Sequence, residues 1–285
     1  MRLASFLFVM AFSLAANAQM DPMAYAKSLY LEGRYAESLR VLNTLIEGES
    51  DNTDALRLQG DCYQKEEKYV AAIQAYEKAA KQKPDDALLY ANWGSAFINL
   101  EQYGEAEKRL KKALKTDNEL PEAHYYMGNV KYFDFRVRAA IQCYDEAIRL
   151  RPTYRDALYM RAASYAELDR PDLALRDYQA ALDLDPKLET ARYNIAVLHL
   201  REKDYGKAVS LLQKIDVDAL SNTADYYFSL GEALFYVGES EASCEAYQEA
   251  MQLGDKESRE IYKRYCLDKE EREAQEQTRT IRMAF

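Results

Sequence analysis

Small residues recur along the chain at intervals of 34 residues, with large apolar residues on either side of them. Small residues of this kind stand where two helices must approach closely, so a fixed interval indicates a repeated helical unit. Three series run in phase: Gly60, Gly94, Gly128, Ala162 and Ala196; Ala72, Ala106, Ala140, Ala174 and Ala208; and Ala79, Ala113, Ala147 and Ala181. Pro84, Pro152 and Pro186 close three of the intervals, because proline cannot continue a helix.

The residues around these positions resemble the tetratricopeptide repeat family. Its pattern is Trp-x-x-Leu-Gly-x-x-Tyr, then Ala-x-x-x-Phe, then Pro. The chain matches it with "LRLQGDCY", "AIQAY" and Pro84, and again with "LYMRAASY", "ALRDY" and Pro186. A third match joins "YANWGSAF" and "AEKRL" to Asn118, which stands in place of proline. The resemblance implies an all-α fold, a right-handed α-solenoid of about seven helix-turn-helix units with a C-terminal capping helix.

The repeat fixes the expected domain organisation. Neighbouring units bury a continuous core between them, so we expect one array rather than two domains. The units lie near residues 19–52, 53–86, 87–120, 121–154, 155–188, 189–223 and 224–255, and residues 256–285 form the capping helix and a polar tail. The first unit is degenerate. The sixth lacks the closing proline and gains one residue, so Gly231 comes late in its series and irregular stacking is expected there.

Residues 1–18 are predicted to be a Sec-type signal peptide. Arg2 precedes an uncharged run from Leu3 to Ala16, and Ala16-Asn17-Ala18 offers a cleavage site after Ala18. A membrane anchor is the alternative, but the run is shorter than the roughly 20 residues that a span needs. We therefore expect a periplasmic or secreted protein without stable membrane insertion after cleavage.

Composition and charge narrow the class of partner. Hydrophobic residues make up 48% and charged residues 30%, which is typical of a folded, water-soluble protein rather than a disordered one. The net charge is −10, and it becomes more negative once Arg2 is removed with the signal. An acidic surface disfavours nucleic acid and anionic lipid, which both attract basic patches.

Four cysteines raise the question of pairing in an exported protein. Cys62 and Cys143 lie two units apart, beyond the Cα separation of about 7 Å that a disulfide spans. Cys244 falls in the second helix of the last unit, and Cys266 falls in the capping helix. The segment between them resembles the closing segment of secreted bacterial tetratricopeptide proteins, which implies a Cys244–Cys266 disulfide. The alternative is two buried thiols.

No arrangement of residues points to catalysis. His124 and His199 fall at repeat positions that normally pack between paired helices, and neither belongs to a His-Glu-x-x-His motif. No Gly-rich phosphate loop, Cys-x-x-Cys or Gly-x-Ser-x-Gly occurs. We therefore expect no enzymatic activity, no cofactor and no metal.

The family resemblance instead implies binding of a protein or extended peptide in a concave groove, lined by the first helix of each unit. Carried onto this sequence, the groove residues are Asn99, Tyr125, Asn129, Tyr132, Phe133, Tyr159, Tyr193, Val197, Phe228, Phe235 and Tyr236. Aromatic side chains suit recognition, since they offer large contact area at low entropy loss. The alternative is that several of these rings pack on one another.

Two further expectations concern the kind of partner. A clamp for a terminal carboxylate, as in chaperone-binding members, is not expected, because Arg57 is followed by Asp61 where the clamp needs Asn. We expect a scaffold or adaptor in the cell envelope. The alternative is self-association into a homo-oligomer or a larger complex.

The fourth unit departs from the pattern at three positions. Phe135 replaces the glycine usual in the turn, Val137 replaces an aromatic residue, and Lys131 takes a position usually held by Tyr. This unit is therefore the first place to look for a partner.

Overall fold

The computed structural model describes residues 21–48 and 52–267, and the predicted signal peptide and polar tail lie outside these ranges. The described residues form helices and no strand. Contacts divide the described residues into two compact parts, one within residues 21–152 and one within residues 153–267, which are described separately. The predicted all-α solenoid architecture is confirmed. No helix among the described residues has the length and hydrophobicity to cross a membrane.

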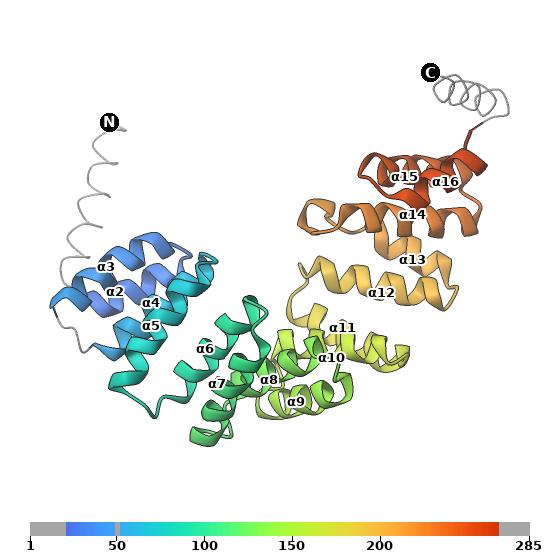
Figure 1. The fold of residues 1–285 in the computed structure, drawn as a ribbon. Helices are drawn as coiled ribbons and strands as arrows, with labels where there is room; N and C mark the ends of the chain where they lie inside the picture. The colour runs from blue at the N-terminus through green and yellow to red at the C-terminus, as the bar shows by residue number, and fades with distance from the viewer. Residues whose placement is uncertain (1–20, 49–51, 268–285) are drawn as a thin grey trace, which may run out of the picture. The chain divides into compact units, whose positions relative to one another are not determined.

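The N-terminal part consists of four consecutive helix pairs (Figure 1). The pairs are α2 (Pro22–Leu31) with α3 (Tyr35–Gly48), α4 (Thr53–Lys65) with α5 (Tyr69–Gln82), α6 (Ala87–Asn99) with α7 (Tyr103–Thr116), and α8 (Pro121–Phe133) with α9 (Val137–Leu150). Helices α3, α5 and α7 also contact the first helix of the next pair, so the core continues from pair to pair within this part.

The C-terminal part contains three pairs and a final helix. The pairs are α10 (Arg155–Glu167) with α11 (Pro171–Leu184), α12 (Glu189–Arg201) with α13 (Tyr205–Leu212), and α14 (Thr223–Val237) with α15 (Ser240–Gln252). The predicted capping helix is α16 (Lys256–Tyr265), which packs on α15. A disulfide joins Cys244 to Cys266, with their Cα atoms 5.5 Å apart.

The sixth repeat is irregular, as its sequence predicts. Helix α13 stops at Leu212, and a short 3-10 turn (η1, Val217–Ala219) leads into α14. Ile215, which lies between α13 and η1, is buried in a hydrophobic cluster with residues of α12, α13, α14 and α15. The hydroxyl of Tyr226 donates a hydrogen bond to the carbonyl of Leu212 at 3.2 Å, which satisfies one acceptor at the early helix end.

The small residues of the first series pack directly against large side chains of the second helix. A Cβ added at Gly128 would overlap the ring of Tyr144, and one at Gly60 would overlap the ring of Tyr76. Both tyrosine side chains are fully buried. The glycines are therefore required by close approach rather than by backbone conformation, as expected from their interval.

This packing predicts opposite effects of one substitution at two glycines. Gly128→Ala is expected to lower the free energy of unfolding by about 1–3 kcal/mol, because the added methyl displaces Tyr144. Gly104→Ala, in a helix with no atom near the new Cβ, should raise it by up to about 1 kcal/mol. Urea unfolding of both variants measures the difference. Equal effects of the two substitutions would contradict the packing argument.

The turn inside each pair uses one backbone conformation throughout the chain. The residue at this position has a positive φ in every repeat, and five of the seven residues are not glycine: Gly33, Glu67, Glu101, Phe135, Asp169, Lys203 and Gly238. Phe135 has φ 56° and its side chain is 88% exposed. The expected replacement of glycine in the fourth turn thus leaves the turn geometry intact.

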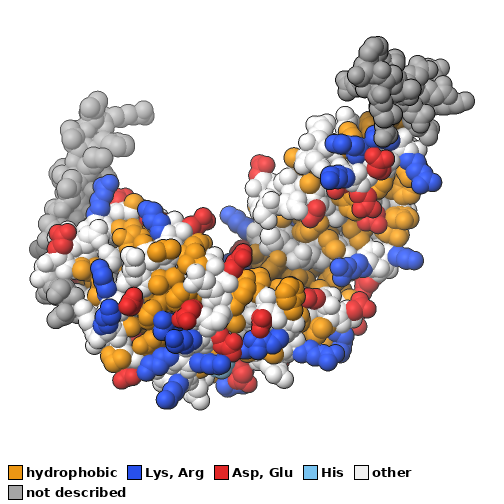
Figure 2. Space-filling view, viewed as in Figure 1, with side chains coloured by type: hydrophobic (Ala, Val, Ile, Leu, Met, Phe, Trp, Pro, Cys, Tyr) orange, Lys and Arg blue, Asp and Glu red, His pale blue; other side chains and the backbone are white. Residues whose placement is uncertain are grey.

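Hydrophobic side chains are visible on the surface of both parts, among scattered acidic and basic ones (Figure 2). Besides Phe135, the exposed aromatic residues include Phe133, Phe235, Tyr236 and Tyr265. Three of these five belong to the predicted groove set, so part of that set is accessible to a partner.

Candidate functional site

Five of the predicted groove residues lie on the first helices of the N-terminal part, Asn99 on α6 and four on α8. The ring of Tyr125 lies 5.2 Å from that of Tyr126, and Asn129 accepts a hydrogen bond from Tyr144 at 2.9 Å. Phe133 remains 43% exposed, although its ring stacks on Tyr103 at 5.8 Å. Tyr132 lies edge-on to Phe133, with ring centroids 5.6 Å apart.

The other six groove residues lie on first helices of the C-terminal part. Tyr159 packs edge-on against Tyr178 at 5.4 Å, and both hydroxyls accept hydrogen bonds from Asn194. The hydroxyls of Tyr193 and Ser229 are hydrogen-bonded at 3.1 Å.

The remaining residues of this set differ in exposure. Phe228 packs edge-on against Tyr247 at 6.0 Å, and Val197 is partly buried on α12. Phe235 and Tyr236 are exposed, and Tyr236 stacks on Tyr205 at 4.3 Å. Several predicted groove rings therefore pack on one another, and those left most open are Phe133, Phe235 and Tyr236.

A polar hollow lies on the first helices of the N-terminal part. Its volume is about 280 Å³. The lining residues come from α2, α4, α6 and α8, with one from the start of α5: Tyr30, Asp61, Gln64, Lys65, Tyr69, Asn92, Ser95, Asn99 and Tyr126. Of these, the predicted groove set contains only Asn99. Apart from Asn99, the residues that line the hollow were not predicted as groove residues, and they come from four repeats.

Asp61 is the acidic residue of this hollow. Its Oδ1 accepts a hydrogen bond from the Tyr76 hydroxyl at 2.7 Å and another from Asn92 Nδ2 at 2.8 Å. Gln64 Nε2 donates to the same Tyr76 hydroxyl at 2.8 Å. Burial raises the pKa of Asp61 above its usual value, although the hydrogen bonds and the nearby Arg57 oppose this shift.

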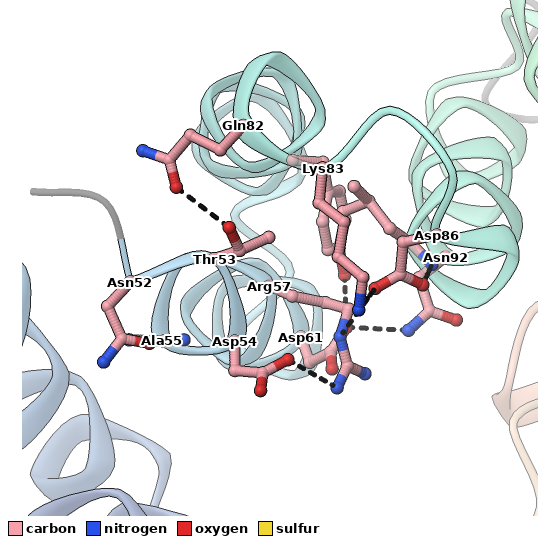
Figure 3. A network of polar contacts seen from close by, with 12 residues as sticks. Asn52, Thr53, Asp54, Ala55, Arg57, Asp61, Gln82, Lys83, Asp86 and Asn92 are labelled. Atoms are coloured by element: carbon pink, nitrogen blue, oxygen red, sulfur yellow. Dashed lines mark hydrogen bonds and ion pairs between the residues drawn. The ribbon is translucent and has the colours of Figure 1, made fainter.

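Arg57 lies one turn before Asp61 on α4 and is surrounded by carboxylates (Figure 3). Its guanidinium nitrogens lie 3.7 Å from Asp54 and 3.8 Å from Asp86. Asp86 also caps α6, since its side chain accepts from the backbone N–H of Leu89 at 3.0 Å. Arg57 therefore connects the second repeat to the start of the third.

Lys131, which takes a position usually held by Tyr, forms an ion pair that joins the fourth repeat to the third. Its Nζ lies 2.6 Å from Glu107 Oε1, and both side chains are partly buried. Lys111 lies 3.0 Å from the same oxygen. The hydrogen bonds from Lys131 and then Lys111 lower the pKa of Glu107 to about 2.

This ion pair predicts a pH dependence of stability. A depressed carboxylate pKa contributes stability above the unfolded value of 4.5, and this contribution is lost as the pH falls towards about 2. Glu107→Gln should therefore be less stable than the wild type at neutral pH, and the difference should vanish near the lower value. Urea unfolding at a series of pH values tests this. Glu77→Gln, in an exposed pair with Lys81, is the control and should change little throughout.

The two histidines take part in local contacts. His124 Nε2 lies 2.8 Å from the carbonyl of Asn118, and His199 Nδ1 lies 3.7 Å from Glu202. Within residues 21–48 and 52–267, no group of three or more His, Cys, Asp or Glu side chains is placed to hold a metal ion. Cys62 and Cys143 are free thiols.

Comparison with known proteins identifies the repeat. Three family profiles described as tetratricopeptide repeat match the chain: one at residues 24–87, 136–189 and 159–221, a second at 63–130 and a third at 224–254. The first profile alone covers more than half of the chain. Together the matched segments extend over all seven helix pairs.

Curated relatives match over part of their length. Protein O-mannosyl-transferase TMTC3 of Homo sapiens is 24% identical over 165 residues, which is 53% of this chain and 18% of the relative. Serine/threonine-protein phosphatase 5 of Rattus norvegicus is 27% identical over 111 residues, 39% of this chain and 22% of the relative. The chain therefore spans about a fifth of the length of these relatives.

Solved structures share the fold. PilF of Pseudomonas aeruginosa superposes with a TM-score of 0.67 at 18% identity, over 75% of this chain and 98% of PilF. YrrB, described as a TPR protein with an unusual peptide-binding site, gives 0.54 at 24% identity, over 65% of this chain and 96% of YrrB. These likenesses show the shared fold, and the profile matches establish that the chain belongs to the tetratricopeptide repeat family.

Proposed function

We propose that the chain is a non-catalytic scaffold that binds a protein or an extended peptide through the first helices of its repeats. The observation that carries this is the polar hollow of about 280 Å³, which four repeats build together on those helices. Peptide binding by YrrB and the name of Hsp70-Hsp90 organizing protein 3 of Arabidopsis thaliana, 24% identical over 139 residues, support such a role.

Exposed aromatic rings would extend the contact area beyond the hollow. Phe133 on α8 is 43% exposed, and Phe235 and Tyr236 on α14 are exposed as well. Rings of this kind are enriched at the centres of protein interfaces, because they bury much apolar area at low entropy cost. These three side chains are therefore proposed partner contacts within their respective parts.

Site-specific photo-crosslinking tests the proposal. A photoreactive phenylalanine at position 133 should capture a protein in the native compartment. The same group at Lys108, an exposed residue of the second helix α7, should capture much less. Equal capture at both positions, or capture at position 108 alone, would show that the first helices are not the binding face.

The compartment is part of the proposal. We propose that the protein is exported to the periplasm or secreted, on the basis of the predicted signal peptide and the Cys244–Cys266 disulfide. N-terminal sequencing of the protein purified from its own cells tests this, with Gln19 expected as the first residue. Retention of Met1 would contradict export by this signal. Light scattering distinguishes a monomeric scaffold from the self-associating alternative.

A further inference from the structure

Asp61 is an ionisable residue at a position whose packing role a neutral side chain can also fill. The corresponding residue in the fourth repeat is Asn129, which accepts a hydrogen bond from the Tyr144 hydroxyl at 2.9 Å. Asp61 accepts the same hydrogen bond from Tyr76 at 2.7 Å. A neutral amide oxygen therefore performs the same structural task two repeats later. The presence of a carboxyl group at position 61 needs a separate explanation.

Neighbouring cations would compensate a charge on this carboxyl group only in part. Arg57 is shared with Asp54 and Asp86. Lys65, the basic residue lining the hollow, forms no ion pair with Asp61 in the described structure. Burial is the largest influence on the pKa of Asp61 and outweighs the effect of Arg57. The carboxyl group thus lines a hollow of about 280 Å³, which has room for a cation.

The other walls of the hollow suit the remainder of a basic side chain. Tyr30, Tyr69 and Tyr126 supply aromatic rings, and Ser95 and Asn99 supply oxygen acceptors. Aromatic rings attract cations through their faces and also cover apolar methylene groups. Carboxylate, amide and hydroxyl oxygens complete the set of acceptors that a guanidinium or ammonium group needs.

We propose that the hollow binds an arginine or lysine side chain of an extended polypeptide, with the cation at Asp61 and the aliphatic stem against the tyrosine rings. This inference rests on the proposed function, because it names the chemistry that the scaffold recognises. It accounts for the carboxyl group of Asp61, since a cation in the hollow would supply the ion pair that Arg57, paired with Asp54 and Asp86, does not form with it.

The test is a titration of the folded full chain with N-acetylarginine amide, followed by NMR of the side-chain amides of Asn92 and Asn99. The wild type should show saturable shifts of both. N-acetylcitrulline amide has nearly the same shape but no charge, and it should bind about tenfold more weakly, because charge-assisted hydrogen bonds are roughly twice as strong as neutral ones.

The matched variants are Asp61→Asn and Asp85→Asn. Asp61→Asn retains the acceptor for Tyr76 and should weaken arginine binding by about tenfold. Asp85→Asn makes the same charge change at a side chain 81% exposed outside the hollow, and should bind as the wild type does. Far-UV circular dichroism verifies that both variants are folded. If Asp61→Asn does not fold, the comparison of arginine with citrulline on the wild type decides.

Three results would overturn the inference: no saturable shift at Asn92 and Asn99, equal binding of arginine and citrulline amides, or unchanged binding by a folded Asp61→Asn. The proposed function fails separately. Crosslinking at position 133 that persists while arginine binding is absent would leave the scaffold role in place and remove only this ligand class. Arginine binding without any crosslinked protein would leave this ligand class in place and count against the scaffold role.

Discussion

Replacing Arg161 with Met is expected to lower the free energy of unfolding of the C-terminal part by about 3–5 kcal/mol. Arg161 Nε lies 2.6 Å from Asp177 Oδ2, and its Nη2 lies 3.0 Å from Oδ1. The Asp177 side chain is only 2% exposed. Removal of the guanidinium would leave a buried carboxylate without its bidentate partner.

The same carboxylate provides the control. Arg176 also lies 3.3 Å from Asp177 Oδ1, but its side chain is 63% exposed. Arg176→Met should therefore change stability by at most about 1 kcal/mol. A third variant, Arg161→Met with Asp177→Leu, removes both charges and should recover most of the loss. Urea unfolding combined with hydrogen exchange of α10 and α11 measures all three. Equal losses for the two arginine variants would contradict the argument from burial.

Loss of the disulfide is the second large effect. Changing both Cys244 and Cys266 to Ser should lower the free energy of unfolding of α15 and α16 by about 3 kcal/mol. The bond closes a loop in the unfolded chain and so reduces the conformational entropy of that state. The two cysteines are separated by 22 residues. Since contacts in a repeat array are local, the effect should be confined to the last repeat and the capping helix.

Chemical reduction of the disulfide offers an independent test of its contribution to stability. Reducing agent added to the wild type should lower the thermal midpoint to that of the double serine variant, and it should not affect the variant itself. Hydrogen exchange should show the loss in α15 and α16. A similar shift in the reduced variant would mean that the agent acts elsewhere, and no shift in the wild type would contradict the stabilising role of the bond.

The sequence predicts the fold well because the repeat positions depend on local geometry. Gly128, for example, lies where the backbone of α8 approaches the ring of Tyr144 so closely that no side chain fits between them. The 34-residue interval of such small residues therefore identifies the contact between paired helices. The irregular sixth repeat is visible as a missing proline and an added residue. The end of α13 at Leu212 is not visible in this way, because it depends on the packing of Ile215 and Tyr226 against the next pair.

The site is less predictable from sequence. Repeat register shows which side chains stand on the first helices, but it does not show which rings cover one another. Tyr159, for example, is held by Tyr178 and Asn194 from two other helices. The hollow is not predicted because it depends on how side chains of four repeats pack beside one another, which repeat register does not show. One signal was present: Asp61 stands at a position where the next two repeats have Ser95 and Asn129.

The shared turn geometry has a practical consequence for labelling and protein engineering. Glycine, acidic, basic and aromatic residues all hold the same left-handed conformation there, so the flanking helices impose the geometry whatever the side chain. Phe135 projects into solvent from such a turn. A fluorophore or an affinity handle attached at this residue would leave both helices undisturbed. The turns therefore offer one attachment point in each described repeat.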